Sequence, residues 1–175
     1  MKKPRLAILG TGNIAHFHCE AFKKAGFEIS VASGSKNSKN ATAFGGKHSV
    51  KKIYADPFDI LKNPHEWDAI LLSTPTENNF DYLDAIIELN KPALIEKPVA
   101  TSSKQLSDFK KNDHKKIRVA YNRRFYSTID FGKEFIKKHQ PIHLRMDLPE
   151  GVNPKGNYKN VLLNSAHGID ILFYL

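Results

Sequence analysis

The chain has 175 residues, of which 41% are hydrophobic and 26% charged, and its formal net charge is +9. These proportions are typical of a globular protein with a buried core, and the length suffices for one full domain and part of a second. The sequence lacks the run of about 18 apolar residues that a membrane-spanning helix needs, and its single cysteine, Cys19, excludes an internal disulfide, which favours a reducing cytoplasm.

Apolar, strand-like segments alternate with helix-like segments along the first two thirds of the chain. Strands are expected at 5–9, 28–33, 51–54, 69–73, 93–96 and 118–121, and helices at 13–25, 38–44, 58–61, 80–89 and 102–111. This alternation predicts βαβ units, a parallel sheet, and right-handed crossovers that place helices on both faces. On the first helix, three-to-four spacing predicts a buried stripe of Ile14, Phe17, Ala21 and Ala25.

The pattern changes after residue 122. A helix is expected at 128–138, a strand of alternating apolar and polar residues at 142–148, a loop at 149–158 and a final helix at 164–175. A single strand without a partner does not make a stable domain. We therefore predict a Rossmann-type, doubly wound parallel sheet of the α/β class in residues 1–122, followed by an incomplete α+β domain in residues 123–175.

The strongest local signal is a GxGxxA segment between the first strand and the first helix. Gly10 allows a tight turn, Gly12 lets the backbone approach a pyrophosphate, and Ala15 lets helix and strand pack closely. Free N–H groups at the start of the helix would then face the phosphates. The strand–turn–helix context predicts dinucleotide contacts at Gly10, Gly12, Asn13 and Ile14, and a tight turn without a ligand is the alternative.

The second predicted strand ends without the carboxylate that usually binds the ribose 2′-hydroxyl of NAD. In its place stand Ser33, Ser35 and Lys36, which are candidates to hold a 2′-phosphate. This composition slightly favours NADP over NAD as the cofactor. A polar turn that contacts nothing is the competing interpretation.

Further candidates follow the fourth and fifth strands, because ligands of such sheets bind beyond the carboxyl ends of the strands. The fourth strand leads into Thr74 and Pro75, and the fifth into Glu96 and Lys97. Lys97, between a strand and a proline, is a candidate functional residue, and an ordinary loop lysine is the alternative.

The histidines separate into two groups. On the last helix, His167 shares a polar stripe with Asp170 and Tyr174, so His167 is a candidate for proton transfer with Asp170 as an orienting acid. His16 and His18 are two residues apart on one helix and therefore point in different directions. No cluster of acids or cysteines joins them, and no metal site is expected.

Five motifs in this order and spacing resemble the Gfo/Idh/MocA oxidoreductases: GxGxxA at Gly10, TPT at Thr74, EKP at Glu96, YNRRF at Tyr121 and HGID at His167. The resemblance implies an N-terminal half that binds NAD(H) or NADP(H). It also implies a C-terminal half that forms an open sheet, contacts the substrate and supplies the oligomer interface. Members oxidise or reduce a ring hydroxyl of a sugar, a sugar nucleotide or an inositol, and most are considerably longer than this chain.

The resemblance also implies roles for individual residues. Lys97 would contact the nicotinamide ribose and the reacting hydroxyl, and His167 would be its partner in proton transfer. The other cofactor contacts that it implies are Thr74, Pro75, Asn79, Glu96, Asn122 and Arg123. Two positions differ from the common pattern: Leu163 stands where an aspartate often precedes the histidine, and Asn79 stands where a histidine often follows the TP motif.

The predicted function is hydride transfer between nicotinamide and a ring hydroxyl of a sugar, sugar nucleotide or related polyol. The alternative is a non-catalytic nucleotide-binding module or truncated remnant, because a poorly anchored His167 would turn substrate over weakly. We expect a homo-oligomer formed through the second domain. The lysines occur in scattered pairs without interleaved aromatic residues, so neither nucleic acid nor a membrane is an expected partner.

Overall fold

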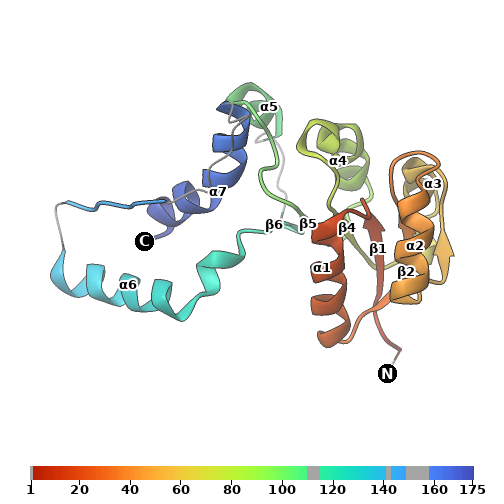
Figure 1. Ribbon diagram of the computed structural model, residues 1–175, viewed down its shortest axis with the longest axis horizontal. Coiled ribbons are helices and arrows are strands. Elements are labelled where there is room, and N and C mark those ends of the chain that lie inside the picture. The colour runs from red at the N-terminus through yellow and green to blue at the C-terminus, as the bar shows by residue number, and fades with distance from the viewer. Residues whose placement is uncertain (1, 110–114, 141–142, 149–157) are drawn as a thin grey trace. The chain divides into compact units, whose positions relative to one another are not determined.

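The computed structural model describes residues 2–109, 115–140, 143–148 and 158–175, and the chain forms two compact units, Met1–Val119 and Ala120–Leu175. In the first unit, six parallel strands form one sheet in the order β3-β2-β1-β4-β5-β6 (Figure 1). The strands are β1 (Arg5–Leu9), β2 (Glu28–Ser33), β3 (Lys52–Ile53), β4 (Ala69–Leu72), β5 (Ala93–Ile95) and β6 (Ile117–Val119). The strand order reverses between β1 and β4, where sheets of this type bind their ligands. The predicted Rossmann-type sheet is confirmed.

The helices of the first unit follow the predicted order. They are α1 (Asn13–Lys24), α2 (Lys39–His48), α3 (Pro57–Lys62), α4 (Asn79–Glu88) and α5 (Ser103–Phe109), with 3-10 turns η1 (Pro64–Glu66) and η2 (Thr76–Asn78). Local signals explain their ends: the side chain of Asp56 accepts a hydrogen bond of 2.9 Å from the amide of Phe58 at the start of α3. A left-handed Gly26 follows α1.

The core lies on both faces of the sheet, because side chains alternate along each strand. On one face Leu6 and Ile8 of β1 pack with residues of α1 and α2, including Cys19 and Phe44. On the other face Ala7 and Leu9 of β1 pack with residues of α3, α4 and the buried Trp67, whose indole N–H donates to the carbonyl of Ile60 at 3.1 Å. The sheet is therefore covered on both sides, as a parallel sheet requires.

The predicted buried stripe of α1 is wrong. Ile14 and Phe17 are 45% and 75% exposed, whereas Ala15 and Cys19 are fully buried. Both sets of residues have helical spacing, so periodicity alone does not select between them. The small side chains of Ala15 and Cys19 let α1 approach the strands closely, and this packing decides which face is buried.

The second unit contains η3 (Asn122–Phe125), α6 (Ser127–His139) and α7 (Tyr158–Tyr174). The strand predicted at 142–148 is wrong for residues 143–148, which form no regular structure. The described part of this unit supplies no strand that could pair with them, so their backbone has no ladder to join. Residue 142 and most of the predicted loop, 149–157, lie outside the described residues. Among the helices described in either unit, none is both long and apolar enough to cross a membrane.

Candidate functional site

The turn between β1 and α1 is locked against the ends of two neighbouring strands. Gly10 has φ +95°, and a Cβ there would lie 2.5 Å from the carbonyl carbon of Ser73, which follows β4. The Gly10 amide donates to the carbonyl of Ser33 at 2.8 Å, and the Ser73 hydroxyl donates to the carbonyl of Gly10 at 2.8 Å. Only glycine fits this position.

Gly12 lies at the end of the same turn, directly before α1. It precedes the first residue of α1 in an extended conformation (φ −75°, ψ −178°), and no atom lies within 4 Å of the Cβ that a side chain would add. Asn13 and Ile14 of the first helical turn are exposed. The backbone at the start of α1 is therefore open to an anion, and the free N–H groups there fit a pyrophosphate.

The loop after β2 differs from its predicted role in one residue. Ser33 is fully buried, and its hydroxyl donates to the carbonyl of Gly34 at 3.2 Å, so it is not presented to a ligand. Ser35 and Lys36 are exposed. The Lys36 ammonium lies 3.9 Å from a carboxylate oxygen of Asp56, which comes from the connection before α3. Sequence analysis missed this acid because it belongs to another segment of the chain.

Asn79 connects two loops at the carboxyl ends of the strands. Its side-chain oxygen accepts a hydrogen bond of 2.9 Å from the Thr74 hydroxyl, and its amide nitrogen donates to the carbonyl of Val99 at 3.4 Å. Asn79 is only 1% exposed, so in this structure its side chain joins the two loops and is not open to a ligand. Thr74 is half-buried, whereas Pro75 is exposed beside the start of η2.

Glu96 and Lys97 follow β5 at the same edge of the sheet. The Glu96 carboxylate forms a close hydrogen bond with Nε2 of His18 on α1 through Oε1, and its Oε2 accepts a hydrogen bond of 3.0 Å from the Lys97 amide. The peptide bond between Lys97 and Pro98 is cis. The carboxylate is thus turned towards the protein, and Lys97 lies half-buried next to it.

The two histidines of α1 contact different partners, as their spacing predicted. His16 Nδ1 lies 2.6 Å from Nε2 of His48 on α2, whose other ring nitrogen is 3.2 Å from a carboxylate oxygen of Glu20. Burial lowers the pKa of His48 below its usual value, which favours its neutral form. Within the described residues, no group of three side chains is arranged to bind a metal ion.

In the second unit, η3 and α7 meet at a charged and aromatic cluster. The predicted stripe of α7 faces this contact, and Asp170, which was expected to orient His167, pairs with Arg124 (Nε to Oδ2, 2.7 Å). The Arg124 guanidinium lies over the rings of Tyr121 and Tyr174, at 5.4 and 4.9 Å from their centroids. Asp170 therefore anchors α7, a role that the sequence pattern did not distinguish.

His167 itself is half-buried and lies edge-to-face with Tyr121, with ring centroids 6.1 Å apart. The other two predicted contacts of this unit, Asn122 and Arg123, are exposed in η3. The second unit thus holds its candidate proton-transfer residue against the YNRRF segment.

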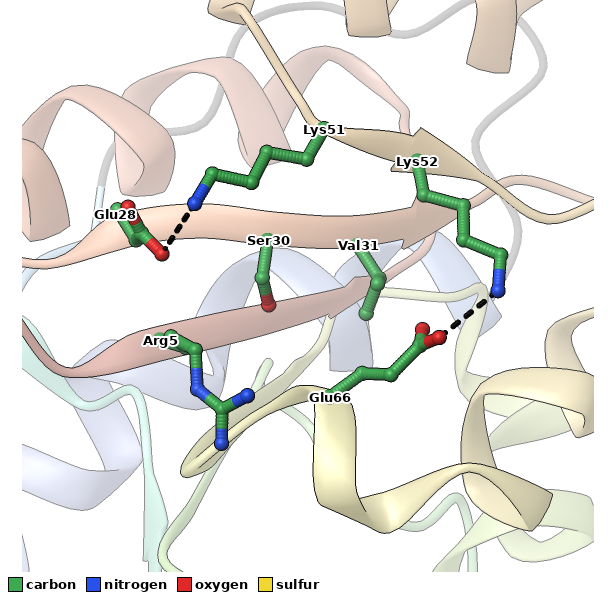
Figure 2. Close-up of a pocket in the computed structure, with 7 residues that line it drawn as sticks. All are labelled: Arg5, Glu28, Ser30, Val31, Lys51, Lys52 and Glu66. Atoms are coloured by element: carbon green, nitrogen blue, oxygen red, sulfur yellow. Dashed lines mark hydrogen bonds and ion pairs between the residues drawn. The ribbon is translucent and has the colours of Figure 1, made fainter.

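A separate hollow of about 260 Å³ lies where the strands begin, away from the Gly10 turn. Figure 2 shows its lining residues, which are Arg5, Glu28, Ser30, Val31, Lys51, Lys52 and Glu66. Its cations are matched by acids: Lys51 pairs with Glu28 at 2.8 Å, Lys52 with Glu66 at 2.9 Å and Arg5 with Asp68 at 2.9 Å. This balance of charge and its place at the amino ends of the strands distinguish the hollow from the candidate dinucleotide site at the Gly10 turn.

The sequence of the first unit matches a known oxidoreductase family. The model of the Gfo/Idh/MocA family, an oxidoreductase family with an NAD-binding Rossmann fold, matches residues 4–122. An inositol 2-dehydrogenase of Mycolicibacterium smegmatis is 28% identical over 131 residues, which cover 71% of this chain and 37% of the relative. An NAD(+)-dependent scyllo-inositol 2-dehydrogenase of Bacillus subtilis is 28% identical over 126 residues, covering 69% of this chain and 36% of the relative.

Solved structures share the fold. The crystal structure of myo-inositol dehydrogenase from Lactobacillus casei, in complex with NAD(H) and myo-inositol, superposes with a TM-score of 0.81 at 19% identity. The match covers 99% of this chain and 54% of that structure. The chain thus spans little more than a third of the length of the curated relatives it matches, and about half of this structure.

Proposed function

This chain belongs to the Gfo/Idh/MocA oxidoreductase family, and from that premise we propose that it transfers a hydride between nicotinamide and a ring hydroxyl of a polyol or sugar-like substrate. The observation that carries the proposal is the β1–α1 turn, which is open at Gly12 and lies at the edge of the sheet where Lys97 follows β5. The inositol dehydrogenases among its relatives support a cyclic polyol as the substrate class.

The proposed roles follow from this arrangement. The N–H groups at the start of α1 would hold the pyrophosphate, with Gly12 leaving room for it. When bound, the cofactor supplies the redox chemistry, and the protein supplies position and a path for the proton. We assign the hydroxyl proton to Lys97, and on the HGID motif alone we propose His167 as a second proton-transfer residue.

The experiment is a turnover assay on inositols, sugars and sugar nucleotides with both cofactors, following the absorbance of reduced nicotinamide. We expect Lys97→Ala to lower kcat by about 10²–10⁴, the usual contribution of a positioned acid–base group. Lys24→Ala, which removes an exposed lysine at the end of α1, is the matched control and should behave like the parent. Turnover that survives in Lys97→Ala would disprove the assigned role.

A second candidate, cofactor binding without turnover, is favoured by the outer face of α7. Ile169 and Leu172 are 44% and 41% exposed, and Phe173 is 90% exposed, so one face of the helix that carries His167 is exposed among the described residues. Catalysis needs the proton acceptor held in near-attack geometry. Tight NADH binding with no turnover on any substrate of the panel would favour this candidate.

We also propose that NADP binds more tightly than NAD, through Ser35 and Lys36. An ammonium–phosphate contact is charge-assisted and is worth about 1.5–3 kcal/mol, although Asp56 competes for the Lys36 ammonium. Lys36→Ala should therefore weaken NADP binding about tenfold and leave NAD binding unchanged, by calorimetric titration. Lys39→Ala, an exposed lysine at the start of α2, is the control. A parent chain that binds NAD as tightly as NADP would overturn this preference.

The homo-oligomer expected through the second unit belongs to the same proposal. Its support is the exposure of three aromatic rings there, because Phe125, Phe131 and Phe173 are 81%, 73% and 90% exposed. Exposed apolar surface of this kind, where it is contiguous, is typical of association surfaces.

A further inference from the structure

His18 links the two ends of the proposed cofactor site. Its helix, α1, begins at the phosphate-binding turn, and His18 lies further along the same helix. From there its Nε2 pairs closely with Oε1 of Glu96, at the end of β5. The side chains of His18 and Glu96 are only 18% and 15% exposed, so little water competes for this contact.

The contact reaches beyond the Glu96 side chain to the backbone of Lys97, because both oxygens of the Glu96 carboxylate are engaged. Oε1 is held by His18, and Oε2 accepts the hydrogen bond from the Lys97 amide. A mostly buried carboxylate that loses one partner turns towards water or another donor, since an unpaired buried charge is costly. Loss of His18 would therefore release the backbone at Lys97 as well.

Residues other than His18 anchor α1 to the sheet. Ala15 and Cys19 are fully buried against the sheet and anchor the helix independently. His18 therefore has a role that can be tested apart from folding.

We propose that His18 is a positioning residue that, through Glu96, holds Lys97 at a fixed position relative to the proposed phosphate-binding turn at Gly12. The inference rests on the proposed function, in which Lys97 contacts the nicotinamide half of the cofactor. A dinucleotide reaches both places, with its pyrophosphate at the turn and its nicotinamide ribose at Lys97. ADP reaches only the first. His18 thus governs the nicotinamide half of the site selectively.

The test compares NADH with ADP as ligands of the full chain, by calorimetric titration. For His18→Leu, we expect NADH affinity to fall about tenfold, the size of one lost charge-assisted hydrogen bond, and ADP affinity to stay within about twofold of the parent. His18→Gln keeps an N–H donor and should restore most of the NADH affinity. His16→Leu is the matched control, because His16 lies on the same helix but contacts His48, and both affinities should be unchanged.

Glu96→Gln provides a second route if His18→Leu does not fold. The amide keeps the shape of Glu96 but has one acceptor oxygen for two donors, so the same selective loss of NADH affinity is expected. Equal losses for NADH and ADP, or no loss at all, would overturn the inference, as would a Gln variant of His18 no better than the Leu variant. A parent chain that binds neither ligand would instead overturn the proposed function itself.

Discussion

Replacement of Gly12 by valine is expected to abolish dinucleotide binding while the fold remains intact. Gly12 has φ −75°, which any residue adopts, and no atom lies within 4 Å of the Cβ that would be added. The valine side chain would therefore fit the protein but occupy the space through which the pyrophosphate approaches the start of α1. We expect NADH affinity to fall at least about a hundredfold, or about 2.7 kcal/mol, by fluorescence or calorimetric titration.

Gly46→Val is the matched control for this experiment. Gly46 is exposed on α2, and nothing lies within 4 Å of its added Cβ either, but it is far along the chain from the turn. Its replacement should leave NADH affinity unchanged. Unchanged affinity in Gly12→Val as well would show that the dinucleotide does not bind at this turn.

Replacement of Gly10 by alanine is expected to affect the fold rather than the ligand site alone, and to cause a large loss of stability. Gly10 has φ +95°, which costs an L residue about 1–2 kcal/mol, and the new Cβ would lie 2.5 Å from the backbone of Ser73. Backbone cannot move aside as a flexible side chain can, and overpacking costs about 1–3 kcal/mol more. The free energy of unfolding should fall by about 2–5 kcal/mol, measured by chemical denaturation.

Gly26→Ala separates the two contributions to this loss. Gly26 has a similar φ of +91°, but nothing lies within 4 Å of its added Cβ. It should cost only the conformational part, about 1–2 kcal/mol. If the two variants lose the same stability, the close approach of Gly10 to the end of β4 is not what requires glycine there.

Much of the first unit could be predicted from local patterns. The positions of β1, β2 and α1 match the expected ones to within a residue, because strand and helix periods are local properties of the chain. The turn at the GxGxxA segment could also be predicted from the sequence, since Gly10 and Gly12 are adjacent to the strand and helix that they join. The family resemblance rested on this segment together with the TPT, EKP, YNRRF and HGID motifs, and the family match over residues 4–122 confirms it.

Side-chain contacts between distant segments of the chain are visible only in the tertiary structure. The pair of His18 with Glu96 spans 78 residues, and that of Arg124 with Asp170 spans 46. No local pattern joins such positions, because their proximity depends on the order of strands in the sheet or on how two helices pack. His18 and Arg124 were therefore missed as candidates, and Asp170 was expected to orient His167.

Packing also overruled local patterns in two places. The apolar residues Ile14 and Phe17 are exposed because the sheet accepts the smaller side chains on the neighbouring face of α1. Residues 143–148 alternate like a strand but form none, because a strand is completed only by hydrogen bonds to another strand. The sequence by itself determined most elements of the first unit and the glycine-rich turn between β1 and α1, since these depend on neighbours along the chain. Which faces are buried and which side chains hold Glu96 and α7 was decided by the tertiary structure, since these depend on neighbours in space.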